Sequence, residues 1–164
     1  MKKLITLIPI FFCMFFAQAQ TEPTDGVYRL VDEMPRFPGC EDIEDEIERR
    51  SCSENELLTF IYENVSYPAI ARENGIEGIC VVQFTIEKNG SISDIKLVRD
   101  IGGGCGEESV RVIQEMIEQD VFWIPGRQNG ENVRVRFTFP IKYKLSDKKE
   151  KRGFFKRLFS RQKY

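Results

Sequence analysis

Apolar and polar side chains alternate along several stretches of the chain, and each stretch predicts a β-strand. In residues 78–86 the apolar side chains that would share one face are Cys80, Val82, Phe84 and Ile86. Asn89 and Gly90 follow as a strong hairpin-turn signal, and the next stretch carries Ile95 and Leu97 on one face. The pattern therefore predicts an antiparallel β-hairpin.

The longest alternation lies at residues 133–143. Its apolar face consists of Val133, Val135, Phe137, Phe139, Ile141 and Tyr143. Its opposite, largely basic face consists of Arg134, Arg136, Thr138, Pro140, Lys142 and Lys144. Pro140 has no N–H to donate to a neighbouring strand, so the strand is expected at a sheet edge, at least around this residue. Proteins normally hide or blunt a long exposed edge, so we interpret this one as a candidate binding surface.

A first amphipathic helix is predicted over residues 53–64. Ser53 and Glu56 form a capping box, and apolar residues follow it at helical spacing, namely Leu57, Leu58, Ile61 and Val65. Tyr67 and Pro68 interrupt the helix. A further short helical segment at 69–73 is expected to end at Asn74-Gly75, a typical left-handed cap.

A second amphipathic helix is predicted after the glycine-rich residues 102–106. Its expected apolar stripe is Val110, Ile113, Met116 and Ile117. A glycine loop before a helix can bind phosphate, but no P-loop lysine and hydroxyl pair follows here. Glu107 and Glu108 also occupy the helix start, where an anion would bind. We therefore interpret the loop as a turn.

The first 19 residues have the pattern of a secretory signal peptide. Lys2 and Lys3 precede an apolar run of 14 residues, and Ala17-Gln18-Ala19 is a typical cleavage site. The run is shorter than the roughly 20 residues of a membrane-spanning helix, so an uncleaved inner-membrane anchor is the less favoured alternative. The protein is expected in the periplasm or cell envelope.

Cleavage would leave four cysteines in an oxidising compartment, where disulfides persist. Cys40 and Cys52 bracket a short acidic segment and are predicted to form a disulfide. Either Cys80 and Cys105 form a second disulfide, or Cys80 is a small buried apolar side chain.

The absence of histidine removes the usual general base and the usual metal ligand. The chain is therefore predicted not to be an enzyme, and no metal or cofactor is expected. The remaining enzymatic alternative is Cys105 as a nucleophile at a helix start, where a thiolate is favoured.

Charge is distributed unevenly around the net value of −2. Residues 1–19 carry +2 and residues 146–164 carry +6, which leaves −10 on the middle of the chain. An acidic body repels phosphate, so nucleic acid is not expected as a partner. The basic tail has Phe154, Phe155, Leu158 and Phe159 at helical spacing, which predicts either a helix on an anionic membrane surface or a disordered solubilising tail.

From residue 54 to residue 145 the chain resembles the carboxy-terminal domain of TonB. The shared pattern includes the hairpin, the second helix and the long last strand. The motif residues are Tyr67, Pro68, Ala69, Ala71, Gly75, Ile76, Glu77, Gly78, Asn89, Gly90, Trp123, Ile124, Pro125, Gly126, Gly130, Pro140 and Ile141. The resemblance implies an α+β fold, with a three-stranded antiparallel sheet and two helices packed on one face. The expected organisation is a signal peptide at 1–19, an extended acidic lead-in at 20–52, the domain at 53–145 and the tail at 146–164.

The resemblance also implies a function. TonB binds the TonB box, a short amino-terminal segment of outer-membrane transporters, by adding it as a strand beside its own last strand, and it uses an inner-membrane proton-motive complex to open the transporter. The edge residues that would bind it here are Val133, Arg134, Val135, Arg136, Phe137, Thr138 and Phe139. Arg134 and Arg136 are expected to pair with acidic side chains of the segment, and replacing Val135 with proline is expected to abolish binding.

The chain departs from the full family pattern in lacking a long apolar anchor and a proline-rich spacer. Peptide binding needs only the domain. The alternative function is a structural or assembly protein that pairs through its edge strand with a second copy, as a homodimer, or with another envelope protein.

Overall fold

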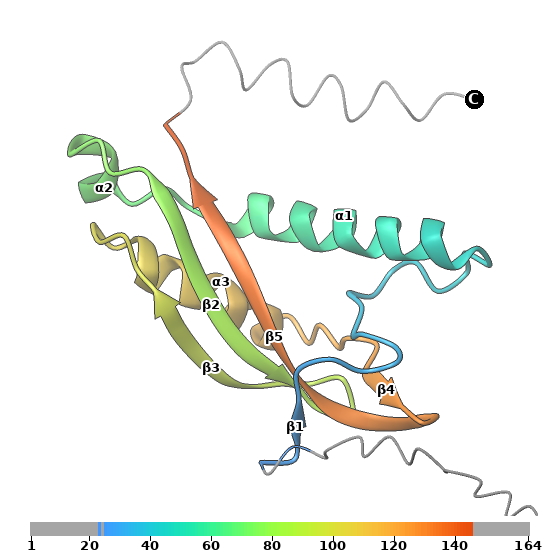
Figure 1. Cartoon of the computed structure of the whole chain (residues 1–164). Coiled ribbons are helices and arrows are strands. Elements are labelled where there is room, and N and C mark those ends of the chain that lie inside the picture. Colours follow the sequence, from blue (N-terminus) through green and yellow to red (C-terminus); the bar gives the residue numbers. More distant parts are fainter. Residues whose placement is uncertain (1–22, 24, 146–164) are drawn as a thin grey trace, which may run out of the picture.

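The computed structural model describes residue 23 and residues 25–145. The fold is α+β, with a mixed sheet whose strands lie in the order β1-β5-β2-β3, and β4 pairs with β5 beside this path (Figure 1). In chain order the elements are β1 (Val27–Tyr28), α1 (Glu46–Asn64), α2 (Ala69–Glu73), β2 (Gly78–Ile86), β3 (Ile92–Arg99), α3 (Cys105–Glu118), β4 (Gly126–Gln128) and β5 (Glu131–Tyr143). The three antiparallel strands predicted from the resemblance are β3, β2 and β5, and the structure adds β1 and β4.

The predicted hairpin is confirmed as β2 and β3, which pair antiparallel. At its turn Gly90 has φ +86°, and a Cβ there would lie 2.1 Å from the carbonyl oxygen of Trp123. The Gly90 carbonyl also accepts a hydrogen bond of 2.9 Å from the Trp123 N–H. Gly90 is therefore required both by the turn and by the chain that packs against it.

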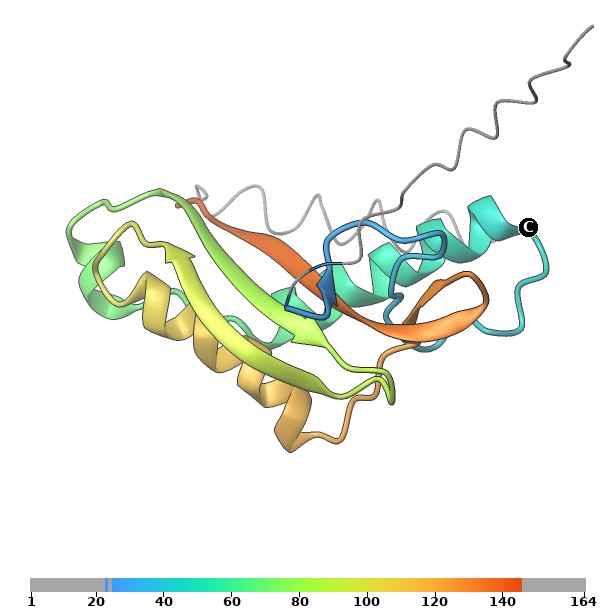
Figure 2. The ribbon, with the colours of Figure 1, turned by 60° about the horizontal axis from the view of Figure 1, so that its bottom comes forward.

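Strand β5 is the longest strand and organises the sheet. It pairs with β2 over an unbroken antiparallel register from Gly78 opposite Tyr143 to Ile86 opposite Val135. The alternation predicted from the sequence is confirmed, since Val133, Val135, Ile141 and Tyr143 are buried and Phe137 and Phe139 are half-buried. The strand curves across the molecule beside β2 (Figure 2).

Helix α1 starts earlier than predicted. It begins at Glu46, because Asp45 is the N-cap and its side chain accepts a hydrogen bond of 2.8 Å from the Glu48 N–H. Ser53, expected to be the cap, lies in the middle of α1. Its side chain is buried, and its Oγ donates a hydrogen bond of 2.8 Å to the Phe37 carbonyl. The predicted boundary at residue 53 thus falls within α1.

The second helix is confirmed as α3, but its predicted stripe is partly wrong. Ile113 and Met116 are buried, whereas Val110 is half-buried and Ile117 is 46% exposed. The buried face instead includes Cys105, Gly106, Ser109 and Val112. A Cβ at Gly106 would lie 2.6 Å from Leu97 Cδ2, so the helix approaches β3 closely and turns its small residues toward the sheet.

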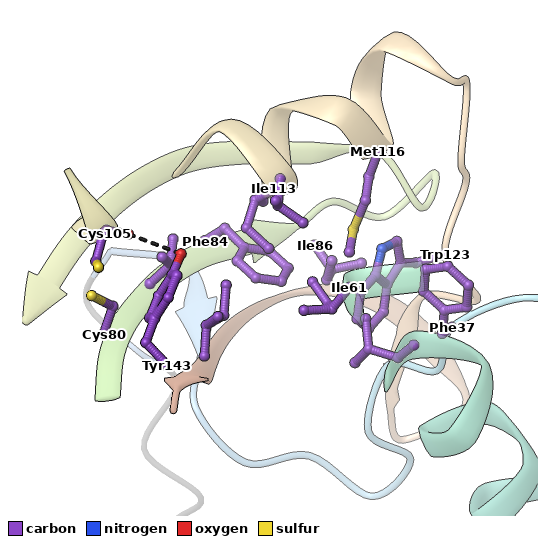
Figure 3. Packing of buried hydrophobic residues seen from close by; sticks show 14 of the residues in the cluster. Phe37, Ile61, Cys80, Phe84, Ile86, Cys105, Ile113, Met116, Trp123 and Tyr143 are labelled. Carbon is purple, nitrogen blue, oxygen red and sulfur yellow. Dashed lines mark hydrogen bonds between the residues drawn. The ribbon is translucent and has the colours of Figure 1, made fainter. Parts of the chain in front are cut away.

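The main core lies between the sheet and helices α1 and α3, which pack on the same face of it (Figure 3). Trp123 is its aromatic centre, with ring centroids 5.1 Å from Phe137, 5.5 Å from Phe37 and 5.8 Å from Phe84. Phe37 comes from the lead-in, whose backbone pairs with the rest of the chain through single bridges from Glu33 to Arg127 and from Arg36 to Ile124. The lead-in is therefore attached to the domain.

The predicted disulfide between Cys40 and Cys52 is confirmed, and it joins the lead-in to α1. Cys80 and Cys105 are buried free thiols whose sulfur atoms face each other in Figure 3. Within the described part of the chain, no helix has the length and apolar character needed to cross a membrane. The predicted signal peptide and basic tail lie outside the described residues.

Candidate functional site

The two ends of β5 have different surroundings on the side away from β2. On this side β1 pairs parallel with Arg134 and Val135, and β4 pairs antiparallel with residues 131–133, beyond the end of the pairing with β2. From residue 136 to residue 143 no described strand pairs with this side of β5. The predicted edge is therefore open around Pro140 and already occupied at Arg134 and Val135, while Val133 pairs with Gly126 of β4.

The direction of the backbone groups along this open edge follows from Pro140. Successive N–H groups of a strand point alternately to its two neighbours, and proline occurs where its nitrogen faces an unpaired edge. The N–H groups of Arg136, Thr138 and Lys142 share the alternation of Pro140 and so face away from β2. The N–H of Arg136 lies at the end of the pairing with β1, and those of Thr138 and Lys142 face the open edge. Those of Val135 and Phe137 face β2, with which both residues are paired.

Arg134 is engaged within the sheet. Its Nε and one terminal nitrogen each donate to the Glu87 carboxylate at 2.8 Å, and the same terminal nitrogen lies 3.3 Å from Asp94. These hydrogen bonds from Arg134 lower the pKa of Glu87. An incoming acidic side chain would have to compete with both carboxylates for Arg134.

Arg136 has a single acidic partner among the described residues, and that partner lies just before β1. One terminal nitrogen of Arg136 donates to Asp25 Oδ2 at 2.8 Å, while Asp25 Oδ1 accepts from the Val27 N–H at 3.1 Å. The backbone hydrogen bond from Val27 and then the bond from Arg136 lower the pKa of Asp25. Arg136 is thus the edge arginine whose acidic partner belongs to the lead-in and not to the β2–β3 hairpin.

The other predicted edge residues divide by face. The Phe137 ring packs in the core against Phe84 and Trp123, and Phe139 is half-buried on the same side. Thr138 is exposed, and its hydroxyl accepts a hydrogen bond of 3.2 Å from Gln83 Nε2. At the open end these residues therefore present backbone groups rather than apolar side chains to a partner.

The predicted motif residues shape the fold around this edge. Tyr67 donates from its hydroxyl to the Ile76 carbonyl, and its ring packs edge-on against Tyr143 at 5.5 Å. Pro68 is the N-cap of α2, and a Cβ at Gly78 would lie 3.0 Å from Ile101 Cγ2.

Gly126, which follows Pro125, has a direct effect on the edge. A Cβ at Gly126 would lie 2.5 Å from Val135 Cγ2, so only glycine lets β4 pack this closely against β5. The glycine in this motif therefore serves strand packing.

The surroundings of Cys105 do not favour its role as a nucleophile. Burial raises the pKa of Cys105 to about 11, so its thiol is protonated at neutral pH instead of being activated at the helix start. Cys80 is also buried, and burial raises its pKa. Among the described residues no group of three or more cysteine, aspartate or glutamate side chains could hold a metal ion.

Sequence reasoning missed both short strands beside β5. A signal for β4 was present, because Asn129 and Gly130 form the turn between β4 and β5, with φ of +52° and +81°. An Asn-Gly pair before an alternating strand is a strong hairpin signal. Strand β1 has two residues and carries no periodicity that could have revealed it.

Residues 63–145 match the family model of the Gram-negative bacterial TonB protein C-terminal domain. The chain therefore belongs to the TonB C-terminal domain family, a non-catalytic family of periplasmic or cell-envelope domains. No curated protein matches the chain in sequence.

Solved structures of TonB domains are also similar. A solution structure of the Helicobacter pylori TonB domain, residues 179–285, has 27% identity and a TM-score of 0.44 and covers 57% of this chain and 81% of that one. The solution structure of the Pseudomonas aeruginosa TonB domain has 28% identity and a TM-score of 0.38 and covers 51% of this chain and 81% of that one.

Proposed function

We propose that this protein is a periplasmic TonB-like domain that binds the amino-terminal segment, or TonB box, of outer-membrane transporters as an added strand beside β5. Binding of this kind would support energy-coupled transport across the outer membrane, with the inner-membrane proton-motive complex as a further partner. The observation that carries the proposal is the open edge of β5 at residues 136–143, next to a position where a short strand is already added.

Two features of the open edge support strand addition. Its backbone donors and acceptors provide affinity that does not depend on the sequence of the partner, as in other cases of strand addition. Arg136 provides a charge beside the same edge, which favours a segment with an acidic side chain. We therefore expect the backbone of Thr138, next to Arg136, to make the first contact with the segment.

Replacing Thr138 with proline tests the proposal at the backbone. The substitution removes one N–H from the open edge and leaves the bonds between β5 and β2 intact, because this N–H faces away from β2. We expect binding of a synthetic peptide containing a TonB box to weaken about tenfold, since one or two strand hydrogen bonds of about 1 kcal/mol are lost. Calorimetric titration measures the dissociation constant.

The matched control is Thr138→Ala, which keeps the N–H and should bind within about twofold of the original chain. Near-ultraviolet circular dichroism from the buried Trp123 verifies that both variants fold. Unchanged affinity in a folded Thr138→Pro variant would contradict binding at this edge. Val135→Pro is a poorer test, because Val135 is fully buried and its N–H faces β2.

A further inference from the structure

Strand β1 already occupies part of the edge to which the proposed partner strand would bind. It lies parallel to β5, with Val27 opposite Arg134 and Tyr28 opposite Val135. Val27 is 5% exposed, and Tyr28 packs against the small cluster of Val31, Val133 and Val135. The segment at residues 25–28 therefore shows how this edge accepts an extended chain.

The pairing of β1 stops after two residues, and the charges beside it give a reason. Continuing the parallel register would place Arg29 opposite Arg136, and like charges directly opposite each other destabilise a strand pair. Arg29 and Arg136 line the same shallow hollow beside β1, together with Asp25, whose carboxylate pairs with Arg136 from the turn before the strand. The ladder thus ends where Arg136 would meet another arginine.

We infer that residues 25–28 occupy, within the same chain, the position of the partner strand. A partner that binds parallel to β5 with a carboxylate opposite Arg136 displaces them. This inference rests on the proposed function and deepens it. Such a strand would keep the two pairings of β1 and continue along residues 136–143, where no described strand competes with it. It would also replace Asp25 as the acidic partner of Arg136.

The inferred exchange predicts opposite effects from changes in β1. The apparent affinity for a partner decreases when a smaller fraction of chains has an open edge. Arg29→Glu places a carboxylate opposite Arg136, should lengthen β1, and should weaken partner binding about fivefold or more. Asp25→Asn removes the ion pair with Arg136, should loosen β1, and should strengthen binding about twofold to fivefold.

The probe is a fluorescein-labelled peptide that copies residues 23–34 of this chain with glutamate in place of Arg29. It is titrated by fluorescence anisotropy into the full exported chain and into the two variants. Leu30→Ala is the matched control, because Leu30 is 80% exposed and lies outside the paired residues, and it should leave the affinity unchanged. Val27→Asp is a second loosening variant, used if its circular dichroism shows a folded chain.

Hydrogen exchange measured with and without the probe separates the outcomes. The inference predicts that the amides of residues 27–28 lose protection while the amide of Thr138 on the open edge gains it. Probe binding that leaves residues 27–28 protected, with equal affinity in all variants, would overturn the exchange and leave strand addition standing. If neither the probe nor a TonB-box peptide binds, the proposed function fails together with the inference. A dimer in light scattering would mean that β1 is exchanged between copies, which would overturn its intramolecular assignment.

Discussion

A small group of buried polar atoms joins the last residues of β5 to the start of α3. The Tyr143 hydroxyl lies 3.1 Å from the Cys105 carbonyl and 3.1 Å from Ser109 Oγ. Ser109 Oγ itself donates to the same carbonyl at 2.7 Å. Burial raises the pKa of Tyr143 to about 12 and that of Cys105 to about 11. Both groups are therefore held in their neutral forms in the folded protein.

These raised values predict how stability changes at alkaline pH. A group whose pKa is higher in the folded state contributes stability that is complete below its unfolded pKa and is lost as pH rises toward its folded pKa. The unfolding free energy should therefore decline from about pH 9, the ordinary pKa of the thiol, through pH 10, that of the phenol. Urea unfolding between pH 7 and pH 10.5 measures this decline.

Tyr143→Phe tests the contribution of the hydroxyl. At pH 7 the variant should lose about 1 kcal/mol, because its hydrogen bonds are removed and the ring remains. Above pH 10 its stability should fall less steeply than that of the original chain. Parallel stability curves over the whole pH range would show that Tyr143 is not the titrating group.

At the scale of elements, α1 begins at a cap that sequence reasoning placed too late. Asp45 accepts the Glu48 N–H, and replacing Asp45 with alanine should cost about 1 kcal/mol of unfolding free energy. Asp42→Ala is the matched control, since Asp42 is exposed and lies outside the cap, and it should change stability by less than about 0.5 kcal/mol. Urea unfolding measures both variants, and equal effects would contradict the assignment of the cap.

The sequence predicted those elements whose own pattern determines them. Periodicity and the Asn89-Gly90 turn located β2, β3 and β5, and the spacing of Cys40 and Cys52 indicated the disulfide. The start of α1 was missed because two segments, at Asp45 and at Ser53, both look like caps, and tertiary packing buries Ser53.

The occupied half of the candidate site could not be predicted in the same way. Strand β1 has two residues, and its position depends on β5 more than one hundred residues away in sequence. The ion pair between Asp25 and Arg136 likewise follows from the fold alone. Only the open half of the candidate site, marked by Pro140 and the alternation of β5, could be predicted from the sequence.

At the scale of the whole molecule, the lead-in and the edge of β5 form one continuous structure. The disulfide and the bridges at Glu33 and Arg36 hold the lead-in against the domain, and β1 lies beside β5 at its amino-terminal end. The division at 1–19, 20–52, 53–145 and 146–164 stays a prediction, as do signal-peptide cleavage and membrane contact by the tail. A partner that approaches β5 would meet β1 as well as the open edge.

The central claim is that a partner segment binds as a strand beside β5. The most direct measurement is a nuclear magnetic resonance study of the isotope-labelled chain with an unlabelled peptide containing a TonB box. The account predicts nuclear Overhauser contacts between the peptide backbone and the backbone of residues 134–139, in the parallel pattern that β1 shows now. Contacts confined to another surface, such as the exposed face of α1, would contradict it.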